Sequence, residues 1–366
     1  MTLYACNNLT NELLWSVAGI FDGHAGSETA FALSTYLRGY IVNELQLATE
    51  PLASTAADQG LKKAFLDLDH DIMSVATQAV QGTRFLNDAI SEVGAAYSGS
   101  CALVSYFNEE TKEFKVACTG DSRAVLGRRN DKGKWEAIPL SIDQTGNNEE
   151  EIQRLQKEHP DEPDMIKKGR LLGLAVTRAF GDGRWKWSRE VQEQAKERFF
   201  GPDIREGLKS PPYLTAEPVV TTIKIDPDRG DFVIMASDGL WDHLSNEQAV
   251  DLVGRWLQTH DMTRPAPPPD LAKGTPEILA PSDLSKKSKP VPGKKYTEQA
   301  KITEKDYVNV DENVATHLVR NAFGGANEDR LLGLVTAEPP LSRELRDDTT
   351  VIVQLFGHDP DAFEEY

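Results

Sequence analysis

Residues 17–26 read VAGIFDGHAG, an apolar run that leads into an acid, a histidine and two glycines. A short, continuous apolar run is typical of a buried β-strand, so we expect a strand over residues 13–21 that ends at Asp22. The glycines permit a tight turn, and Ser27 is suited to cap a helix that runs to about Leu47. This segment predicts a strand–turn–helix unit with a carboxylate and an imidazole at its turn.

Three other acidic stretches share this context. ASDGLWD (residues 236–242) follows the apolar run 231–235, RDDTT (residues 346–350) precedes an apolar run, and GDSR (residues 120–123) lies between two strand-like runs. Because strand ends can meet at one edge of a sheet, we expect these acids to converge. Asp-Gly is also common in ordinary turns, and GDSR is equally compatible with a plain hairpin turn.

The acids expected to converge are oxygen donors, which suit Mg²⁺ or Mn²⁺ and not zinc. The carbonyl of Gly23 is a further candidate ligand, and His24 is suited to act as a general acid because its ordinary pKa lies near neutrality. Adjacent residues of an extended chain point to opposite sides, so we expect only one of the two acids in RDDTT to face the metal. The candidate carboxylates are Asp22, Asp121, Asp238, Asp242 and one of the pair Asp347 and Asp348. Cations held in this way would assist a hydrolysis.

The order of the other expected elements indicates the fold class. Three strands follow one another closely, and the first two are joined by a connection of hairpin length. Long helices are present but do not strictly alternate with strands, which favours a layered α/β domain with antiparallel sheets. We expect strands at 100–107, 113–119, 123–128, 231–237 and 349–356, and helices at 55–80, 147–159, 245–259 and 311–322. The third of these helices opens with a Ser-x-x-Gln capping box.

Charge and composition exclude several function classes. The chain has 366 residues with 40 basic and 58 acidic side chains, a net charge of −18. This balance disfavours a nucleic-acid partner, because phosphate backbones bind basic faces. No apolar run reaches the length of about eighteen residues that a membrane span requires. The chain also lacks a phosphate-binding P-loop, a Gly-x-Ser-x-Gly elbow and a His-Glu-x-x-His helix.

The cysteines and the first residues bear on the compartment. Three cysteines do not form a disulfide framework, and Cys101 and Cys118 lie in apolar runs where we expect buried thiols. Residues 1–14 contain no Lys or Arg, so we expect neither a signal peptide nor an Arg-rich transit peptide there.

Residues 262–305 differ from their surroundings, because they are rich in proline and lysine and poor in large apolar residues. We expect a flexible insertion within a domain and not a domain boundary. Its lysines are compatible with a solvated loop or with docking of an acidic partner.

In this order, the motifs resemble those of the metal-dependent type 2C serine/threonine protein phosphatases. The matching stretches are VAGIFDGHAG (17–26), SGS (98–100), TGDSRA (119–124), LAVTRAFGD (174–182), ASDGLWD (236–242) and RDD (346–348). The resemblance covers most of the chain. The segments RAFGD…WKW, PPYLTAEP and NVATHLVRNA also resemble the pyruvate dehydrogenase phosphatase branch of the family.

The resemblance implies an α/β (α+β) sandwich, with two central antiparallel β-sheets flanked by α-helices in one catalytic domain over residues 1–366. It implies hydrolysis of phosphoserine and phosphothreonine in proteins by a metal-activated water. Asp22 would bridge two cations with Gly23 on one of them, Asp238 and Asp347 would complete the other site, and Asp121, Asp238 and Asp242 would hold a weaker third ion. His24 would protonate the leaving oxygen.

The resemblance further implies a flap over residues 143–212, in which Arg178 and Asp182 are expected to be structural. The partner would be a phosphoprotein substrate, either of the pyruvate dehydrogenase complex or another mitochondrial phosphoprotein. The location would be mitochondrial, or cytoplasmic in the absence of a transit peptide.

One departure from the family pattern leaves a second function open. Family members carry an Arg and a Glu-Asp pair on a strand before the Asp-Gly-His motif, whereas here the residues before Leu14 contain the acid Glu12 and no Arg. We expect that strand to be missing and the edge of the next strand to be exposed. The alternative to an active phosphatase is therefore a truncated, catalytically impaired phosphatase-like binding module.

Overall fold

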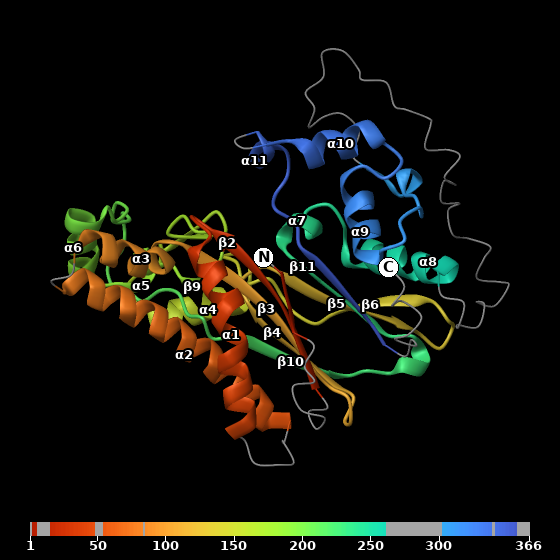
Figure 1. Ribbon diagram of the computed structural model, residues 1–366, viewed down its shortest axis with the longest axis horizontal. Coiled ribbons are helices and arrows are strands. Elements are labelled where there is room, and N and C mark those ends of the chain that lie inside the picture. Colours follow the sequence, from red (N-terminus) through yellow and green to blue (C-terminus); the bar gives the residue numbers. More distant parts are fainter. Residues whose placement is uncertain are drawn as a thin grey trace. The chain divides into compact units, whose positions relative to one another are not determined.

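The computed structural model describes residues 2–5, 15–47, 54–82, 85–260, 302–338 and 341–356 (Figure 1). The chain forms two compact units, each described here by itself. Unit 1 comprises Met1–Arg123 and Leu140–Lys224, and unit 2 comprises Ala124–Pro139 and Ile225–Tyr366. Among the described helices, none combines the length and the apolar character that crossing a membrane requires.

Unit 1 is built on an antiparallel sheet with the strand order β1-β2-β3-β4-β10. The short strand β9 (Phe180–Gly181) pairs with the start of β3. The five strands on the main path are β1 (Thr2–Ala5), β2 (Trp15–His24), β3 (Gly99–Asn108), β4 (Glu113–Thr119) and β10 (Val219–Lys224). The hairpin expected between the runs 100–107 and 113–119 is confirmed, because β3 and β4 pair directly and Asn108 Oδ1 accepts the Glu110 and Thr111 N–H groups of the connection.

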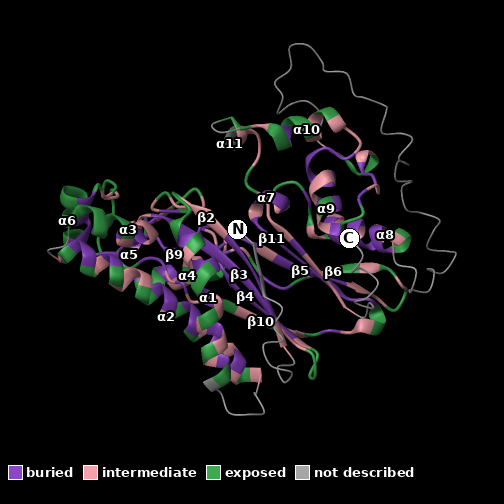
Figure 2. Cartoon of the chain, viewed as in Figure 1, coloured by how far each residue is buried: buried purple, intermediate pink, exposed green. Residues whose placement is uncertain are grey.

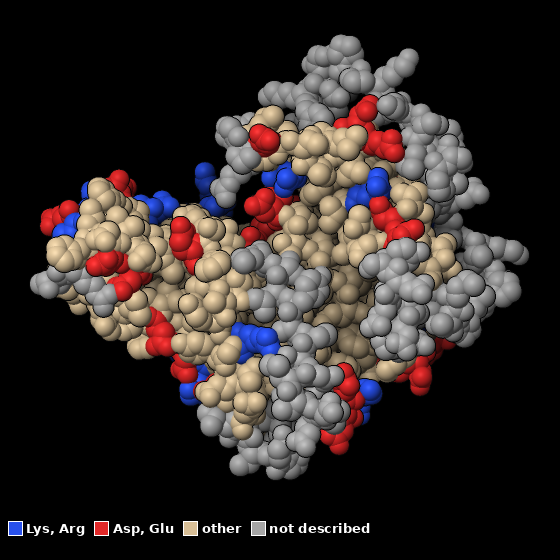
Figure 3. Space-filling view, in the orientation of Figure 1, with Lys and Arg blue, Asp and Glu red and all other residues tan. Residues whose placement is uncertain are grey.

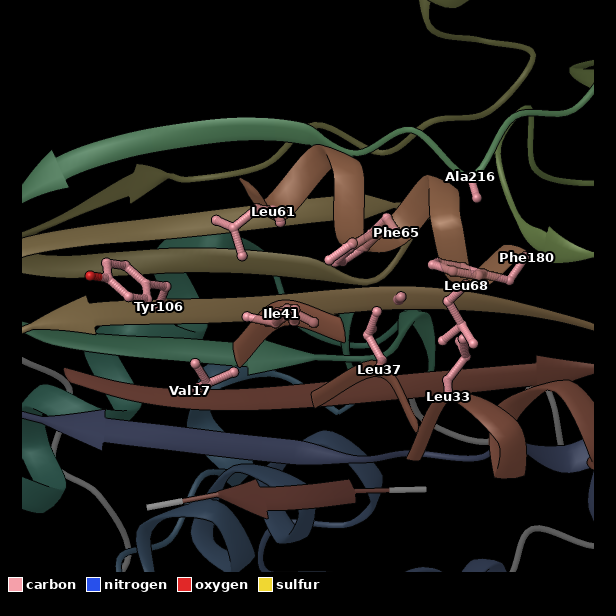
Figure 4. Packing of buried hydrophobic residues seen from close by; sticks show 14 of the residues in the cluster. Val17, Leu33, Leu37, Ile41, Leu61, Phe65, Leu68, Tyr106, Phe180 and Ala216 are labelled. Atoms are coloured by element: carbon pink, nitrogen blue, oxygen red, sulfur yellow. The ribbon is translucent and has the colours of Figure 1, made fainter. Parts of the chain in front are cut away.

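Three helices belong to the same unit, and two of them lie on the sheet. These are α1 (Glu28–Leu47), α2 (Ser54–Gln81) and α3 (Leu86–Tyr97). Figure 4 shows apolar side chains of α1 and α2, among them Leu37 and Phe65, packed in one cluster with strand residues such as Tyr106 of β3. In Figure 2 the strands β2, β3 and β4 are largely buried, whereas these helices alternate between buried and exposed residues. Burial of the sheet-facing stripe fixes both helices on the sheet.

The remainder of unit 1 consists of shorter elements between β6 and β10 in the sequence. They pack around Trp185 and Tyr213 in one apolar cluster, and α6 packs on α2 and α3 through Trp187 in another. The elements are α4 (Glu149–Glu158), β7 (Ile166–Lys167), β8 (Arg170–Leu171), α5 (Gly183–Lys186) and α6 (Arg189–Phe199).

Unit 2 has its own sheet with the strand order β12-β11-β5-β6. Its strands are β5 (Arg123–Arg129), β6 (Trp135–Pro139), β11 (Phe232–Ala236) and β12 (Val351–Leu355). Its helices are α7 (Asp238–Trp241), α8 (Asn246–His260), α9 (Val314–Phe323), α10 (Glu328–Thr336) and α11 (Ser342–Leu345), with 3-10 turns at Pro227–Arg229 and Glu304–Asp306. The capping box predicted for α8 is confirmed: the Ser245 N–H donates to Gln248 Oε1 (3.0 Å) and the Gln248 N–H donates to Ser245 Oγ (3.2 Å).

The predicted fold class is confirmed, since both central sheets carry antiparallel pairs and are flanked by helices. The plain-hairpin interpretation of GDSR is wrong, because β4 and β5 belong to different sheets. The helix α3 was not expected. Residues 262–301 of the predicted insertion lie outside the described residues. On the face that Figure 3 shows, acidic and basic side chains are interspersed.

Two strand predictions need correction. β2 does not end at Phe21 but continues through His24, because Asp22, Gly23 and His24 pair in register with residues of β3. The expected exposed edge of β2 is covered over Val17–Ile20 by β1, whose pairing satisfies backbone groups that an edge would leave open.

Candidate functional site

In unit 1, the Asp-Gly-His motif forms the last three residues of β2. Asp22 lies opposite Cys101, Gly23 opposite Ser100 and His24 opposite Gly99 in β3. The buried Ser100 hydroxyl donates to the main-chain carbonyl of Asp22 (3.1 Å) and ties the two strands together. Sheet pairing thus fixes the backbone of all three motif residues before the chain turns into α1.

The turn after this motif depends on small residues. A Cβ on Gly23 would lie 3.1 Å from the Ala30 Cβ and 3.3 Å from the Gly26 carbonyl oxygen, so α1 approaches too closely for a side chain without displacement. Ala25 has a φ of 57° and Gly26 a φ of 143°, values that L side chains rarely adopt. The sequence pattern therefore reflects a close strand-to-helix turn.

His24 is held by Asp182. Its Nε2 lies 2.6 Å from Asp182 Oδ2, and the Asp182 side chain is only 1% exposed whereas that of His24 is 29% exposed. Asp182 adopts a φ of 54° and its N–H donates to the Ser98 carbonyl (2.8 Å), which directs its carboxylate at the imidazole. A Cβ on Gly99 would lie 2.2 Å from Asp182 Oδ2, so this pair needs a glycine beneath it.

The electrostatics of this pair favour a protonated imidazole. Burial alone would lower the pKa of His24, but the hydrogen bond and charge of Asp182, together with the charges of Asp121 and Asp22, raise it above the ordinary value. A raised pKa increases the protonated fraction of the imidazole at any given pH, and a protonated imidazole can give up its proton in a reaction.

Asp121 lies beside the same strand pair. Cys101 Sγ donates to Asp121 Oδ1 (3.3 Å). Burial raises the pKa of Asp121, and the hydrogen bond from Cys101 opposes this shift without cancelling it. Gly120, with a φ of 106°, brings the turn against Cys101, because a Cβ there would meet the thiol at 2.2 Å. Burial and the charges of Asp121 and Asp22 raise the pKa of Cys101 well above its usual range, which keeps it a neutral thiol, as expected for a buried cysteine.

In unit 2, Asp238 and Asp242 share one helical turn. Asp238 is the first residue of α7, and the Asp242 N–H donates to the Asp238 carbonyl (2.9 Å). Side chains four residues apart on a helical turn lie on one face, so the spacing expected from the sequence is realised. Asp238 is half-buried and Asp242 is exposed.

The turn that carries Asp347 lies beside Asp238. Ser237, the residue before Asp238, donates its hydroxyl to the Asp348 carbonyl (3.0 Å) and accepts the Thr350 N–H (3.0 Å). β11 and β12 pair with Ala236 opposite Val351, which brings both acidic stretches to the same end of two neighbouring strands. A Cβ on Gly239 would lie 2.7 Å from the Asp348 carbonyl, so the two turns are in close contact.

The donor sets within each unit fit a hard divalent cation. They consist of aspartate carboxylates and the Gly23 carbonyl, which are ligands of Mg²⁺ and Mn²⁺. Within the described ranges, no three His, Cys, Asp or Glu side chains of the structure are grouped as a ready metal site.

Two residues of the predicted flap behave differently from each other. Arg178 is part of a buried network, with its Nε 2.9 Å from Glu151 Oε1 and its Nη1 donating to the Glu217 carbonyl (2.7 Å). Asp182 was expected to be structural as well, but its carboxylate contacts His24. The sequence offered no signal for this contact beyond the quoted RAFGD motif, since the two residues are 158 positions apart.

Comparison with known proteins decides the family. The protein phosphatase 2C model matches residues 2–279. The chain belongs to the protein phosphatase 2C family. It is 41% identical over 351 residues to a protein phosphatase 2C homologue of Schizosaccharomyces pombe, covering 93% of this chain and 73% of that protein. The resemblance noted in the sequence, to a family of serine/threonine protein phosphatases, is thereby confirmed.

Relatives with a named substrate are also similar. The mitochondrial pyruvate dehydrogenase phosphatase 1 of Saccharomyces cerevisiae is 37% identical over 366 residues, and that of Rattus norvegicus is 35% identical over 339 residues. The chain covers 61% and 59% of the length of these two proteins. A crystal structure of serine-threonine phosphatase 2C from Toxoplasma gondii matches 95% of this chain and 87% of that chain with a TM-score of 0.51 at 16% identity, which supports the fold.

Proposed function

We propose that this chain is a protein phosphatase that removes phosphate from phosphoserine and phosphothreonine with the help of Mg²⁺ or Mn²⁺. Family membership supports the reaction class. At the level of residues, the proposal rests on the gathering of acids within each unit: Asp22 and Asp121 lie against Cys101, and the turns of Asp238 and Asp347 are in contact. Both units would belong to one catalytic domain, with residues 143–212 as a flap.

In this proposal, Asp22 and the Gly23 carbonyl, with Asp238 and Asp347, hold two cations. Asp121, Asp238 and Asp242 hold a third, weaker one. The bound cations would supply an activated water and charge stabilisation at the phosphate. Two observations support these assignments. All the proposed donors are oxygen atoms, and their backbone is held by the pairing of β2 with β3 and by the Ser237 hydrogen bond.

His24 would supply the proton for the leaving serine or threonine oxygen. Alkoxide leaving groups are strongly basic, so a positioned acid at this oxygen accelerates bond cleavage. The Nε2 contact with Asp182 fixes the ring plane and stabilises the charged imidazole, which leaves Nδ1 as the nitrogen available for donation. Asp182 therefore acts through His24 as a positioning residue.

The substrate is proposed to be a phosphoprotein of the pyruvate dehydrogenase complex, and the location mitochondrial. The support is the similarity to proteins named mitochondrial pyruvate dehydrogenase phosphatases. The similarity to the S. pombe homologue, whose name gives no substrate, is higher.

A second candidate function is a phosphatase-like binding module without activity. One observation favours it: the strand β1 that pairs with β2 consists of Thr-Leu-Tyr-Ala and brings no Arg or Glu. Both candidates are tested by incubating the purified chain with Mn²⁺ and a phosphothreonine peptide. Phosphate release that stops with EDTA supports the enzyme, equal release with EDTA contradicts the metal mechanism, and peptide binding without release supports the binding module.

A further inference from the structure

A cavity of about 630 Å³ lies in unit 1, apart from the residues discussed above: none of Asp22, His24, Asp121 and Asp182 lines it. Its volume is in the range of small-ligand sites. The cavity lies entirely within residues 162–209, in the segment proposed as a flap. Its wall carries an excess of basic side chains, namely Lys167, Arg170, Arg184, Arg205 and Lys209, against Glu162, Asp164 and Glu206.

The acids of the wall do not neutralise these cations. The Glu162 carboxylate accepts hydrogen bonds from two hydroxyl groups: Tyr213 donates to its Oε2 (2.7 Å) and Ser210 Oγ donates to its Oε1. Asp164 and Glu206 are exposed, and neither forms a salt bridge with another described residue. In a chain of net charge −18, a concave surface with surplus positive charge is unusual.

Two guanidinium groups of the wall converge on one aromatic ring. The Cζ atoms of Arg184 and Arg205 lie 5.8 Å and 5.3 Å from the centroid of the Trp185 ring. Burial and the charge of Arg205 lower the pKa of Arg184, as expected for like charges held close together. Gly173, with a φ of 90°, brings the chain to the same place, because a Cβ there would lie 3.2 Å from Arg205 Nη1.

One donor of each guanidinium group lacks an acceptor among the described residues. The Nε atoms of Arg184 and Arg205 are buried, and neither has a hydrogen-bond partner among the described residues. A buried donor without an acceptor is costly, and the charges of Arg184 and Arg205 repel each other. The charge of Asp203, which pairs with Lys196, opposes this repulsion only in part, since the pKa of Arg184 stays lowered. An oxyanion with several oxygens would offset the repulsion between the two charges, because the remaining N–H groups of the planar guanidinium fork match phosphate geometry.

We propose that this cavity is a second oxyanion site, which binds a phosphate group through Arg184 and Arg205. The phosphate would come either from a second phosphorylated residue of the protein substrate or from a free phosphate compound. Phosphate binding here does not depend on the proposed hydrolysis. Only the choice of the substrate as the source rests on that proposed function.

The test is calorimetric titration of inorganic phosphate into the full chain in EDTA, which removes the divalent cations that would hold phosphate among the acids. We expect one phosphate to bind, and Arg184→Gln or Arg205→Gln to weaken the binding about tenfold or more. Arg205→Lys keeps the charge but loses the guanidinium fork, so its phosphate affinity should lie between that of the wild-type chain and that of Arg205→Gln. Arg189→Gln is the matched control, because Arg189 is exposed and pairs with Glu193 (3.6 Å) outside the cavity.

No phosphate binding by the wild-type chain, or equal binding by all folded variants, overturns the proposal. Circular dichroism and melting temperature identify a variant that fails to fold. If an Arg→Gln variant does so, the phosphate affinity of Arg205→Lys is compared with that of the wild-type chain instead.

Singly and doubly phosphorylated peptides distinguish the two sources in the Mn²⁺ assay. If the substrate supplies the phosphate, the Arg→Gln variants raise KM for the doubly phosphorylated peptide about tenfold more than for the singly phosphorylated one. If a free compound supplies it, the two KM values change by the same factor while calorimetric binding is still lost. Phosphate binding without release from either peptide would contradict the proposed function and leave the second site standing.

Discussion

His24 Nε2 and Asp182 Oδ2 lie 2.6 Å apart although 158 residues separate them in the chain. The contact joins the end of β2 to the residue that precedes α5 within unit 1. A buried carboxylate that holds an imidazole fixes its orientation and its tautomer. This pair gives the predicted general acid a defined position.

Replacing Asp182 with Asn tests the pair directly. Asn tolerates the left-handed φ of 54° at this position, so the fold should persist while the charge is lost. We expect kcat on a phosphothreonine peptide to fall about tenfold to a hundredfold, with KM nearly unchanged. The loss should be much smaller with an aryl phosphate, whose leaving group needs no proton. Equal losses on both substrates, or no loss relative to the exposed control Asp161→Asn, would contradict the role.

Gly99→Ala tests the same contact through packing. The added Cβ would meet Asp182 Oδ2 at 2.2 Å and His24 Nε2 at 2.3 Å, so the pair must separate. We expect a loss of roughly 1–3 kcal/mol in the free energy of unfolding and a fall in activity. The matched control is Gly39→Ala in α1, where nothing lies within 4 Å of the new atom and a gain of about 0.4–1 kcal/mol is expected. Urea denaturation of both variants gives the comparison.

Ser237→Ala tests the contact between the two acidic turns of unit 2. The buried hydroxyl joins the Asp348 carbonyl and the Thr350 N–H, and both would lose a partner. We expect a cost of about 1–2 kcal/mol in the free energy of unfolding and a higher Mn²⁺ concentration for half-maximal activity. Unchanged Mn²⁺ dependence would show that this contact does not position the acids.

His317 predicts a pH dependence of stability. It is fully buried, and burial lowers its pKa from 6.5 to about 4, with the charge of Asp311 opposing the shift. As the pH falls, His317 takes up a proton near pH 6.5 in the unfolded chain but only near pH 4 in the folded chain. The contribution of neutral His317 to the free energy of unfolding is therefore fully present above pH 6.5 and declines as the pH falls toward 4. We expect a loss of roughly 2 kcal/mol between pH 7.5 and pH 5 in urea denaturation.

The His317→Gln variant should lack the part of the stability loss that protonation of His317 causes. The His70→Gln variant should retain that loss, because His70 is an exposed residue of α2. Identical pH dependence in the wild-type chain and His317→Gln would contradict the assignment.

The sequence predicted local features well. The helices α2 and α8, the Ser245–Gln248 capping box and the β3–β4 hairpin follow from periodicity, caps and turn residues, which act over a few positions. The acids at strand ends were recognised for the same reason. These signals depend on neighbours in the chain and survive without knowledge of the fold.

Tertiary contacts were beyond the reach of such signals. Asp182 meets His24 only because β9 pairs with β3, and Arg184 meets Arg205 only because both pack on Trp185. Likewise, β2 extends to His24 because β3 supplies partners, which an isolated strand pattern does not reveal. Register and packing decide these contacts, and one sequence without alignment carries no direct record of them.

In the proposed mechanism, the aspartates hold the divalent cations that phosphate release requires. The most direct test measures phosphate release from a phosphothreonine peptide at increasing Mn²⁺ for the wild-type chain, Asp22→Asn, Asp238→Asn and Asp347→Asn, with the exposed Asp161→Asn as control. We expect release by the wild type and the control, none by Asp22→Asn and Asp238→Asn, and a higher Mn²⁺ requirement for Asp347→Asn. Wild-type rates in all three variants, or release that persists in EDTA, would contradict it.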